Sequence, residues 1–419
     1  MDSDSKTRAI AELYAKHINP GLARLMSFAG YGLEVRAEGC YIWDDEGKKY
    51  LDCLGGYGVF ALGHRNPEVV ATAKKALDTM PLSGKAFFNE SAGLLAQKLS
   101  QITPDALQYS FFCNSGAEAV EGAIKAARSA SGKHKIISTV GGYHGKTFGA
   151  LSATGREAYK KPFGPMLEEF IFVAYGDSNA LAEAVDSQTA AVLLEPIQGE
   201  AGIYVPPDNY ISDVRKICDG KGVLLIFDEV QTGFGRTGKM FGMDHSKVCP
   251  DLVTFAKALG GGVVPIGTFM GTQEVWDKFF GDNPLIHTST FGGNPLATSC
   301  ALATIEVIEK NNLCENSAKM GERMKASLIA TRNEYKDLIS EVRGKGLMIG
   351  VEFSMDDVAE LVIAQMVKRG VAAAYTLNNK HVIRFEPPLI ITESEVDFAC
   401  EVFAESIKET ASLLSAINI

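Results

Sequence analysis

The stretch Val223-Leu-Leu-Ile-Phe-Asp-Glu-Val-Gln-Thr232 gives the clearest indication of the fold. Its first five residues form a continuous apolar run, which is typical of a strand buried on both faces of a parallel sheet. The run ends at Asp228, and a carboxylate in such a place is costly unless it meets a cation or strong hydrogen-bond donors. The stretch therefore predicts a core strand that ends in a carboxylate, held either by the positive charge of a ligand or by a structural salt bridge.

Similar short runs alternate with helical stretches from about residue 105 to residue 270. This alternation indicates an α/β fold in which helices cover both faces of a mainly parallel sheet. Ligands of open α/β sheets bind at the loops beyond the carboxyl ends of the strands, so we expect the site there. Besides residues 223–227, the predicted strands are residues 109–112, 136–140, 191–194, 252–255 and 266–270.

The 419 residues suggest two or three domains, because a domain has about 150 residues. Residues 1–50 are expected to form an N-terminal segment that packs with the C-terminal domain. Residues 51–310 are expected to form a large domain that contains the main sheet. Residues 311–419, with strands at 347–353 and 382–385, are expected to form a small α+β domain.

Composition and charge exclude several classes of protein. The chain is 46% hydrophobic and 22% charged, which excludes a disordered or low-complexity protein. Lys+Arg minus Asp+Glu is 41 − 51 = −10, and this acidic balance argues against nucleic-acid binding. The apolar runs are too short to cross a membrane, and the N-terminus has no signal-peptide pattern. We therefore expect a cytoplasmic protein whose eight cysteines are reduced thiols.

Two glycine-rich segments imitate nucleotide-binding motifs. Residues 233–238 have the G-x-G-x-x-G spacing of a nicotinamide oxidoreductase, but they do not follow the strand directly and no clear helical period comes after them. Residues 141–147 resemble the P-loop of a nucleotide hydrolase, but Val140 stands where that motif requires Gly. The seven histidines have no zinc-ligand spacing, so no metal site is predicted.

A phosphate-binding turn is predicted directly after the strand at 109–112. Ser115 and Glu118 have the S-x-x-E spacing of a helix capping box, and an apolar stripe at helical spacing follows them. A helix that begins at Ser-Gly offers free N–H groups and the positive end of its dipole to a phosphate. An ordinary helix cap is the alternative.

Lys257 follows the strand at 252–255, and its neighbours are small, with Ala256, Ala258 and three glycines at 260–262. A lysine among small residues can lose its hydration, which favours the neutral amine that reacts with a carbonyl group. Most lysines are solvated surface charges, but the loop of Lys257 is expected at the same sheet edge as Asp228. We therefore predict that Lys257 is the reactive amine.

Seven motifs occur along the chain in one order. They begin at Ser115 (SGAEA), Gly142 (GYHGKT), Glu195 (EPIQGEAG), Phe227 (FDEVQTGFGRTG), Lys257 (KALGGG), Thr290 (TFGGNP) and Arg343 (RGKGLM). In sequence and in order they resemble the motifs of the class III pyridoxal-phosphate aminotransferases. The resemblance covers nearly the whole chain, from about residue 25 to residue 410. It implies fold type I of the pyridoxal-phosphate enzymes, with pyridoxal 5′-phosphate as the cofactor of the large domain.

The resemblance implies roles for five residues around the cofactor ring. Lys257 would hold the cofactor covalently and shuttle the proton during catalysis. Asp228 would pair with the protonated ring nitrogen, and Gln231 would hydrogen-bond the phenolic oxygen of the ring. Tyr143 would stack on one face of the ring, and Val230 would pack on the other.

The resemblance also implies how the cofactor phosphate is held. The turn formed by Ser115, Gly116 and Ala117 would cradle it, although the family more often has Thr where Ala117 stands, so backbone N–H groups must suffice. His144 is expected at the cofactor site as well. Thr290 would reach the phosphate of the neighbouring subunit, which implies a homodimer or a dimer of dimers.

Within the family, the segments that begin at Asp52, Gly63, Tyr109 and Arg384 look most like those of the putrescine (diamine) aminotransferases. This likeness implies that the terminal amino group of a diamine is moved to a 2-oxo acid, 2-oxoglutarate or pyruvate, by a ping-pong mechanism. An ornithine or acetylornithine aminotransferase is the main alternative. A same-fold aminomutase, which would need no second substrate, is a further one.

Four residues are expected to bind the substrates. Tyr57 would receive the second ammonium of a diamine. Lys146 stands where ornithine aminotransferases typically have Arg, and it either grips a carboxylate less specifically or simply faces solvent. Glu200 would neutralise Arg384 when an amine is bound and release it when a keto acid is bound. A structural salt bridge between Glu200 and Arg384 is the alternative.

Overall fold

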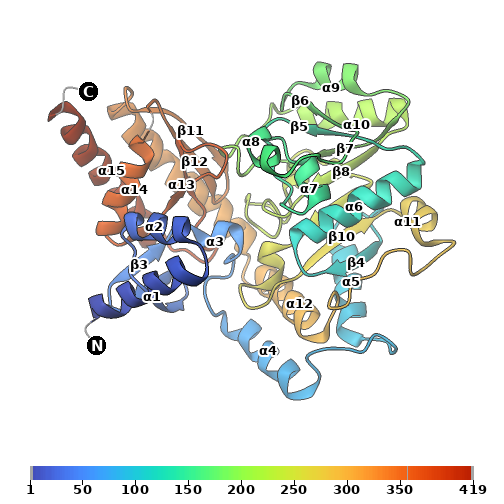
Figure 1. Ribbon diagram of the computed structural model, residues 1–419, viewed down its shortest axis with the longest axis horizontal. Coiled ribbons are helices and arrows are strands. Elements are labelled where there is room, and N and C mark those ends of the chain that lie inside the picture. Colours follow the sequence, from blue (N-terminus) through green and yellow to red (C-terminus); the bar gives the residue numbers. More distant parts are fainter. Residues whose placement is uncertain (1–2, 356, 417–419) are drawn as a thin grey trace.

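The computed structural model describes residues 3–355 and 357–416. Figure 1 shows two groups of elements: the N-terminal and C-terminal parts of the chain lie together on one side, and the middle of the chain forms a large sheet with its helices on the other. The described residues contain no helix that is long and apolar enough to cross a membrane. None of the eight cysteines forms a disulfide, as predicted.

The large sheet has seven strands and is mainly parallel, which confirms the predicted α/β fold. One strand, β10, runs antiparallel to both of its neighbours. One further strand, β6, is missing from the sequence prediction; it lies at the sheet edge and is half-exposed, although its residues Phe-Ile-Phe-Val form an apolar run like those of the other strands. In spatial order the strands are β4 (Tyr109–Cys113), β10 (Gly267–Gly271), β9 (Leu252–Phe255), β8 (Leu224–Asp228), β7 (Thr189–Leu194), β5 (Lys135–Thr139) and β6 (Phe170–Val173).

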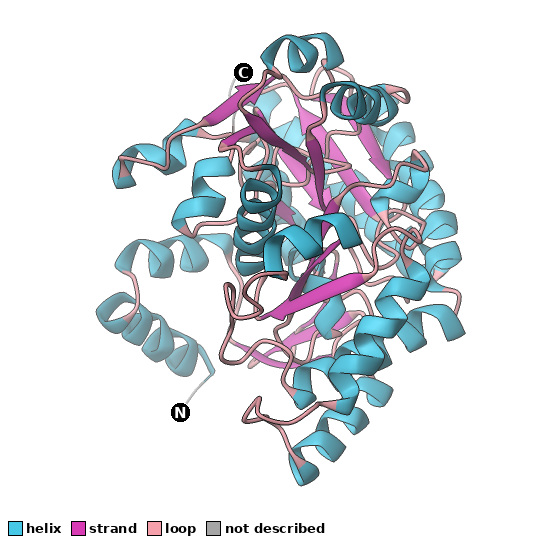
Figure 2. Ribbon diagram, turned by 90° about the vertical axis from the view of Figure 1, so that its right-hand side faces the viewer, coloured by secondary structure: helices cyan, strands magenta, loops and turns pink. Residues whose placement is uncertain are grey.

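Helices cover both faces of this sheet, and Figure 2 shows them on either side of the strands. The alternation along β8 gives the reason. Ile226 packs into one hydrophobic core, while Leu225 and Phe227 pack into the other, and all three are fully buried. The first core takes side chains from α6 (Gly116–Ser131), α7 (Phe148–Ala153) and α11 (Gln273–Phe280), and the second from α9 (Ser178–Ala184), α10 (Tyr210–Lys221) and α12 (Pro295–Lys310).

Two smaller sheets accompany the large one. The first has the order β1-β2-β3-β13, from β1 (Glu34–Glu38), β2 (Tyr41–Asp44), β3 (Lys49–Asp52) and β13 (Val371–Ala372). It joins strands from both ends of the chain, because β13 pairs in parallel with β3. The second has the order β11-β12-β15-β14 and is antiparallel, from β11 (Ile339–Lys345), β12 (Met348–Phe353), β15 (Val382–Phe385) and β14 (Ala374–Tyr375).

The remaining helices lie around these sheets. The N-terminal and C-terminal ones include α1 (Ser3–His17), α2 (Pro20–Ala29), α13 (Leu313–Glu334), α14 (Val358–Lys368) and α15 (Glu393–Ala416). The others lie between strands: α3 (Gly55–Gly58), α4 (Pro67–Thr79), α5 (Glu90–Ile102), α8 (Glu157–Lys160), and the 3-10 turns η1 (Lys161–Phe163), η2 (Gly242–His245) and η3 (Lys257–Gly260).

The strand directions bring five loops to one edge of the large sheet. Strands β5, β7, β8 and β9 are parallel, and β4 runs in the same direction because β10 is antiparallel to both β4 and β9. Their carboxyl ends therefore lie at the same edge. The loops that begin there carry Ser115, Tyr143, Glu195, Asp228 and Lys257.

Candidate active site

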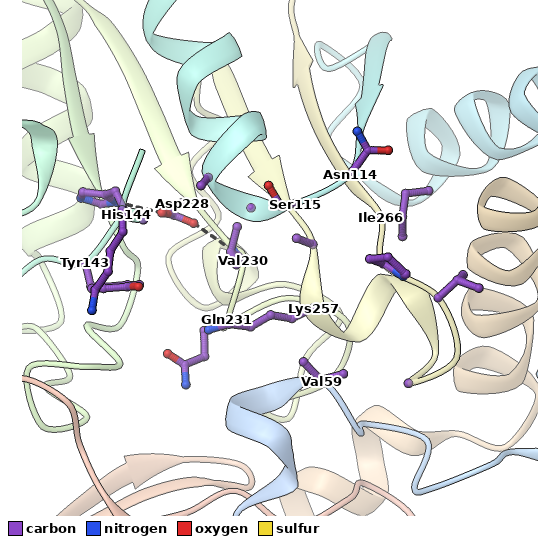
Figure 3. Close-up of a pocket in the computed structure, with 18 of the residues that line it drawn as sticks. Val59, Asn114, Ser115, Tyr143, His144, Asp228, Val230, Gln231, Lys257 and Ile266 are labelled. Atoms are coloured by element: carbon purple, nitrogen blue, oxygen red, sulfur yellow. Dashed lines mark hydrogen bonds and ion pairs between the residues drawn. The ribbon is translucent and has the colours of Figure 1, made fainter. Parts of the chain in front are cut away.

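A cavity of about 540 Å³ opens at this edge of the sheet, a size typical of small-molecule and cofactor sites. Figure 3 shows the side chains that line it, which come from loops after several different strands. It is lined by ten of the residues predicted from sequence: Ser115, Gly116, Ala117, Tyr143, His144, Lys146, Asp228, Val230, Gln231 and Lys257.

Asp228 ends strand β8 and is 3% exposed. Three hydrogen bonds hold its carboxylate: from His144 Nδ1 at 2.8 Å, from the Val230 N–H at 3.1 Å and from Thr254 Oγ1 at 3.2 Å. The first two are drawn in Figure 3. Among the described residues the ion-pair partner of Asp228 is His144, at 2.8 Å, and no Lys or Arg pairs with it. The carboxylate lies at the cavity and is fixed for a cationic partner there.

Lys257 begins the turn η3, and one residue, Ala256, separates it from the end of strand β9. It has a φ of +45°, which is uncommon for a residue with a side chain. In Figure 3 its side chain extends across the cavity toward Gln231. Gly58 faces the stem of Lys257, and a Cβ added at Gly58 would lie 3.8 Å from Lys257 Cδ. The amine of Lys257 is therefore held in the same cavity as the carboxylate of Asp228.

Ser115 caps helix α6, since its Oγ accepts a hydrogen bond from the Glu118 N–H at 3.2 Å. The capping box differs from the predicted one in its second half. The Glu118 carboxylate accepts from the N–H of Asn114, one residue before the cap, at 2.6 Å. Gly116 is required by close packing, because an added Cβ would lie 2.9 Å from Val230. The first turn of α6 thus points free N–H groups at the cavity, as a phosphate site needs.

Glu195 lines the cavity too, although no role was predicted for it. It follows strand β7 and accepts hydrogen bonds from the N–H groups of Tyr143 at 2.9 Å and Gly199 at 3.0 Å. Burial raises the pKa of its carboxyl group to about 7. The signal in the sequence is the one that marks Asp228: a carboxylate at the end of a buried apolar strand. Glu195 fixes the backbone of the loop that carries Tyr143.

Glu200 and Arg384 form a buried ion pair outside the cavity lining. Arg384 Nη1 donates to Glu200 Oε1 at 3.0 Å, and Arg384 is fully buried. Burial opposes ionisation of Glu200, but the charge of Arg384 outweighs it and lowers the pKa of the Glu200 carboxyl group. The guanidinium carbon of Arg384 lies 5.1 Å from the centre of the Tyr57 ring. The structure thus brings together three of the four predicted substrate residues.

Tyr57 lies in the tight turn α3, where four consecutive residues have positive φ. The other three are Gly55, Gly56 and Gly58, which adopt this backbone without strain. Tyr57, with φ +59°, is the one residue of the turn that has a side chain, and 47% of its surface is exposed. The turn therefore presents the Tyr57 ring beside Arg384 and next to Val59, which lines the cavity.

Glu386 is a buried carboxylate that sequence reasoning missed. Gln231 Nε2 donates to both of its oxygens, at 2.9 and 3.1 Å, and Arg384 Nη1 lies 3.5 Å from it. The available signal was its place in the segment Arg384-Phe-Glu-Pro-Pro-Leu389, where the acid directly follows a buried strand. The contact with Gln231 spans 155 residues of sequence, so no local pattern indicates it.

Two predicted residues lie at the surface. Lys146 is exposed at the cavity, and its ammonium is 4.7 Å from the centre of the Tyr159 ring. Thr290 is exposed and does not line the cavity of its own chain. The neighbouring Ser289 does approach the site, since Asn114 Nδ2 donates to Ser289 Oγ at 3.3 Å. Both surface residues are open to a substrate or to another subunit.

These features fit a phosphorylated, aldehyde-bearing ring with a protonated nitrogen. The N-terminus of α6 suits its phosphate, the carboxylate of Asp228 suits the ring nitrogen, and the amine of Lys257 suits the aldehyde carbon. Among the described residues, no group of three or more His, Cys, Asp and Glu could hold a metal ion. The cavity therefore has the donor set of a pyridoxal-phosphate site.

Comparisons with known proteins agree with this chemistry. The model of the family "Aminotransferase class-III" matches residues 31–407. An (S)-enantioselective omega-transaminase from Thermomicrobium roseum is 32% identical with a TM-score of 0.89, over 96% of this chain and 98% of that one.

Two further solved structures are similar to this chain over almost its full length. A transaminase from the marine bacterium Virgibacillus is 30% identical with a TM-score of 0.90, over 97% of this chain and 100% of that one. The ornithine aminotransferase from Toxoplasma gondii is 31% identical with a TM-score of 0.87, over 93% and 96%; another structure of that enzyme contains pyridoxal phosphate at partial occupancy in its active site. The family match and these likenesses show that the chain belongs to the class III aminotransferases, the pyridoxal-phosphate-dependent transaminases.

Proposed function

We propose that this transaminase moves the terminal amino group of a diamine, such as putrescine or cadaverine, to a 2-oxo acid, 2-oxoglutarate or pyruvate. The observation that carries the proposal is the buried pair of Glu200 and Arg384. With Glu200 in place, Arg384 offers no free positive charge to repel a dication. The exposed Tyr57 ring beside this pair offers a π face and a hydroxyl to the second ammonium.

The bound cofactor supplies an electron sink for the carbon from which a proton is removed. Lys257 holds the cofactor and carries that proton through its amine. Asp228 keeps the ring nitrogen protonated, and the hydrogen bond from His144 Nδ1 at 2.8 Å fixes the carboxylate in place for this task. Gln231 would donate to the phenolic oxygen of the ring through the second N–H of the amide whose NH₂ group also contacts Glu386.

The remaining contacts to the cofactor follow from the family resemblance, and the presence of these residues in the cavity lining supports them. Tyr143 would stack on one face of the ring, and Val230 would pack on the other. Ser115, Gly116 and Ala117 hold the phosphate, where the dipole of α6 adds a favourable field. Ala117 has no hydroxyl to contribute, so the N–H groups of this turn carry the contact.

The same residues serve both half-reactions. When the amine is bound, Glu200 stays on Arg384. When the 2-oxo acid enters, Glu200 moves aside and Arg384 takes the α-carboxylate through a charge-assisted, bidentate pair. One active site thereby accepts two substrates of opposite charge in turn, as a ping-pong mechanism requires.

We further propose that the working unit is a homodimer or a dimer of dimers, in which Thr290 reaches the phosphate of the neighbouring subunit. Its exposure outside the cavity of its own chain supports this. Large apolar side chains near Thr290, in sequence or in space, are exposed. Their exposure favours burial of this surface against a second copy. These side chains include Phe87 at 86%, Phe88 at 107% and Phe291 at 57% exposure.

We also propose the domain division expected from the sequence: 1–50 packed with the small domain, 51–310 as the large cofactor-binding domain, and 311–419 as the small domain. The pairing of β13 with β3 supports the first part of it, as does the hydrogen bond from Tyr31 Oη to the Ala373 carbonyl at 3.1 Å.

Ornithine or acetylornithine is the second candidate donor, and the likeness to the Toxoplasma gondii ornithine aminotransferase favours it. Lys146 weighs against it, because a lysine lacks the planar fork that grips a carboxylate in two places. The ammonium of Lys146 also lies over the Tyr159 ring.

A donor panel separates the two candidates. Putrescine, cadaverine, ornithine, acetylornithine, lysine and 4-aminobutyrate are each tested against 2-oxoglutarate and pyruvate, and kcat/KM is compared. We expect the diamines to be the best donors. If ornithine or acetylornithine exceeds both diamines by a wide margin, the diamine proposal is wrong. Turnover without any 2-oxo acid would instead indicate an aminomutase.

A further inference from the structure

The carboxylate of Glu386 occupies a fixed place between two residues of the site. Glu386 directly follows strand β15, and its backbone N–H donates to the Cys53 carbonyl at 2.8 Å. The turn that carries Tyr57 packs against its backbone so closely that a Cβ added at Gly55 would lie 2.0 Å from the Glu386 carbonyl oxygen. Glu386 is 0% exposed. The backbone of Glu386 therefore cannot move without moving the turn that carries Tyr57.

The side chain of Glu386 determines how the amide of Gln231 is turned. An ionised carboxylate has only acceptors, so the amide must present its NH₂ group to Glu386, as the contacts at 2.9 and 3.1 Å show. The amide oxygen then faces Gly199, where an added Cβ would lie 1.8 Å from it. The absent side chain at Gly199 makes room for this one orientation.

Glu386 also gives Arg384 a second carboxylate neighbour. Arg384 Nη1 lies 3.5 Å from Glu386 and 3.0 Å from Glu200, so the buried guanidinium lies between two carboxylates. A buried charge without a partner is strongly unfavourable. When Glu200 moves aside, Glu386 remains beside Arg384 and compensates its charge.

We propose that Glu386 is a positioning residue, which orients the amide of Gln231 and holds Arg384 in place while Glu200 exchanges. This inference rests on the proposed function, because it acts through the roles given there to Gln231 and Arg384. Glu386 does not belong to the cavity lining. Glu386 adds a negative charge beside Arg384, and the buried Arg236 is a second cation whose charge acts on Glu386; loss of the Glu386 charge therefore disfavours a cationic donor.

The test uses the holoenzyme and the variants Glu386→Gln and Glu386→Asp. Glu386→Gln has almost the same shape but no charge, and its amide can also donate to the Gln231 oxygen, so Gln231 is free to turn over. We expect the ratio of kcat/KM for diamine to kcat/KM for 2-oxo acid to fall about tenfold, which is about 1.4 kcal/mol. The absorbance maximum of the bound cofactor should shift as well. Glu386→Asp keeps the charge, but its shorter side chain withdraws the carboxylate from Gln231. It should therefore shift the absorbance and preserve the ratio of the two kcat/KM values.

Glu352→Gln is the matched control. Glu352 lies on the neighbouring strand β12 and pairs with Arg343, away from the cavity. Its loss is expected to leave both the ratio and the absorbance as in the wild type. The proposal is overturned if Glu386→Gln keeps the wild-type ratio and absorbance, if it changes only the melting temperature, or if neither Glu386 variant folds. A wild-type protein without a cofactor band or transaminase activity would instead overturn the proposed function.

Discussion

Glu200 is bound by two different parts of the C-terminal chain, because Arg384 Nη1 donates to its Oε1 at 3.0 Å and the Leu377 N–H donates to its Oε2 at 2.9 Å. The Asn378 N–H also donates to the Glu200 carbonyl at 2.9 Å. A change in the Glu200 side chain is therefore transmitted both to the guanidinium and to the loop at 377–378. These contacts support the proposed role of Glu200 as the partner that exchanges with the 2-oxo acid on Arg384.

Arg384→Ala should weaken the 2-oxo acid half-reaction far more than the amine half-reaction. The loss corresponds to one charge-assisted pair, about 2–3 kcal/mol. Glu200→Gln should do the reverse, since Arg384 then stays unmasked against a dication. Single-turnover absorbance measurements on each half-reaction give the two rates separately. Equal losses in both half-reactions, together with lower thermal stability, would mean that the pair is only structural.

Lys257→Ala should abolish turnover, with a loss of at least ~10²–10⁴-fold, because the amine that carries the proton is gone. The variant should still bind the cofactor without a covalent bond, through the phosphate and ring contacts. Treatment of the yellow wild-type protein with borohydride should leave the pyridoxyl group on Lys257, as peptide mass mapping would show. A colourless wild-type protein, or a pyridoxyl group on another lysine, would contradict the assignment.

Asp228→Ala should reduce the turnover number by ~10²-fold or more, because it removes a fixed charge from the place where the ring nitrogen must stay protonated. It also takes a hydrogen-bond partner from His144. The absorbance of the bound cofactor across pH provides the check, since its protonation midpoint should move. An unchanged midpoint with reduced activity would mean that Asp228 acts only on the fold.

The core strands and the loops after them were predictable because their signal is local. Continuous apolar runs marked β7, β8 and β9, and Asp228 stood out as a charge at the end of one of them. The partners of Arg384 were not predictable in this way. Its contact with Glu200 spans 184 residues, and only the resemblance to a family indicated it. Glu386 was missed because both of its partners are set by tertiary packing.

Thr290→Ala should raise the dissociation constant of the cofactor ~10- to 100-fold, which corresponds to one hydrogen bond to a charged group. The effect requires a second subunit, because Thr290 does not line the cavity of its own chain. Cofactor fluorescence titration measures the constant, and sedimentation at the assay concentration measures the assembly. Thr288→Ala, two residues away and also exposed, is the matched control. A fully active monomer would contradict the prediction.

Glu195 should make the stability of the protein depend on pH in a defined direction. Its carboxyl group has a pKa of about 7 in the fold, raised by burial from an ordinary value of 4.5. Between these values the folded state holds more protons than the unfolded state, so the free energy of unfolding falls as the pH rises. In Glu195→Gln this loss is absent, because the amide does not titrate.

The variant should therefore be less stable than the wild type at pH 5, where its NH₂ group faces the N–H donors of Tyr143 and Gly199. The gap is the difference in free energy of unfolding between the wild type and the variant. By pH 7.5 it should narrow by more than about 1.4 kcal/mol, the equivalent of one pKa unit. Urea unfolding at both pH values, with saturating cofactor throughout, measures the gap. Glu393→Gln is the control: its exposed carboxyl has a pKa below 4.5 because Lys319 is beside it, so its gap should stay constant over this range. Parallel stability curves for the wild type and Glu195→Gln would show that Glu195 is ionised throughout, and that burial is offset by its two N–H donors.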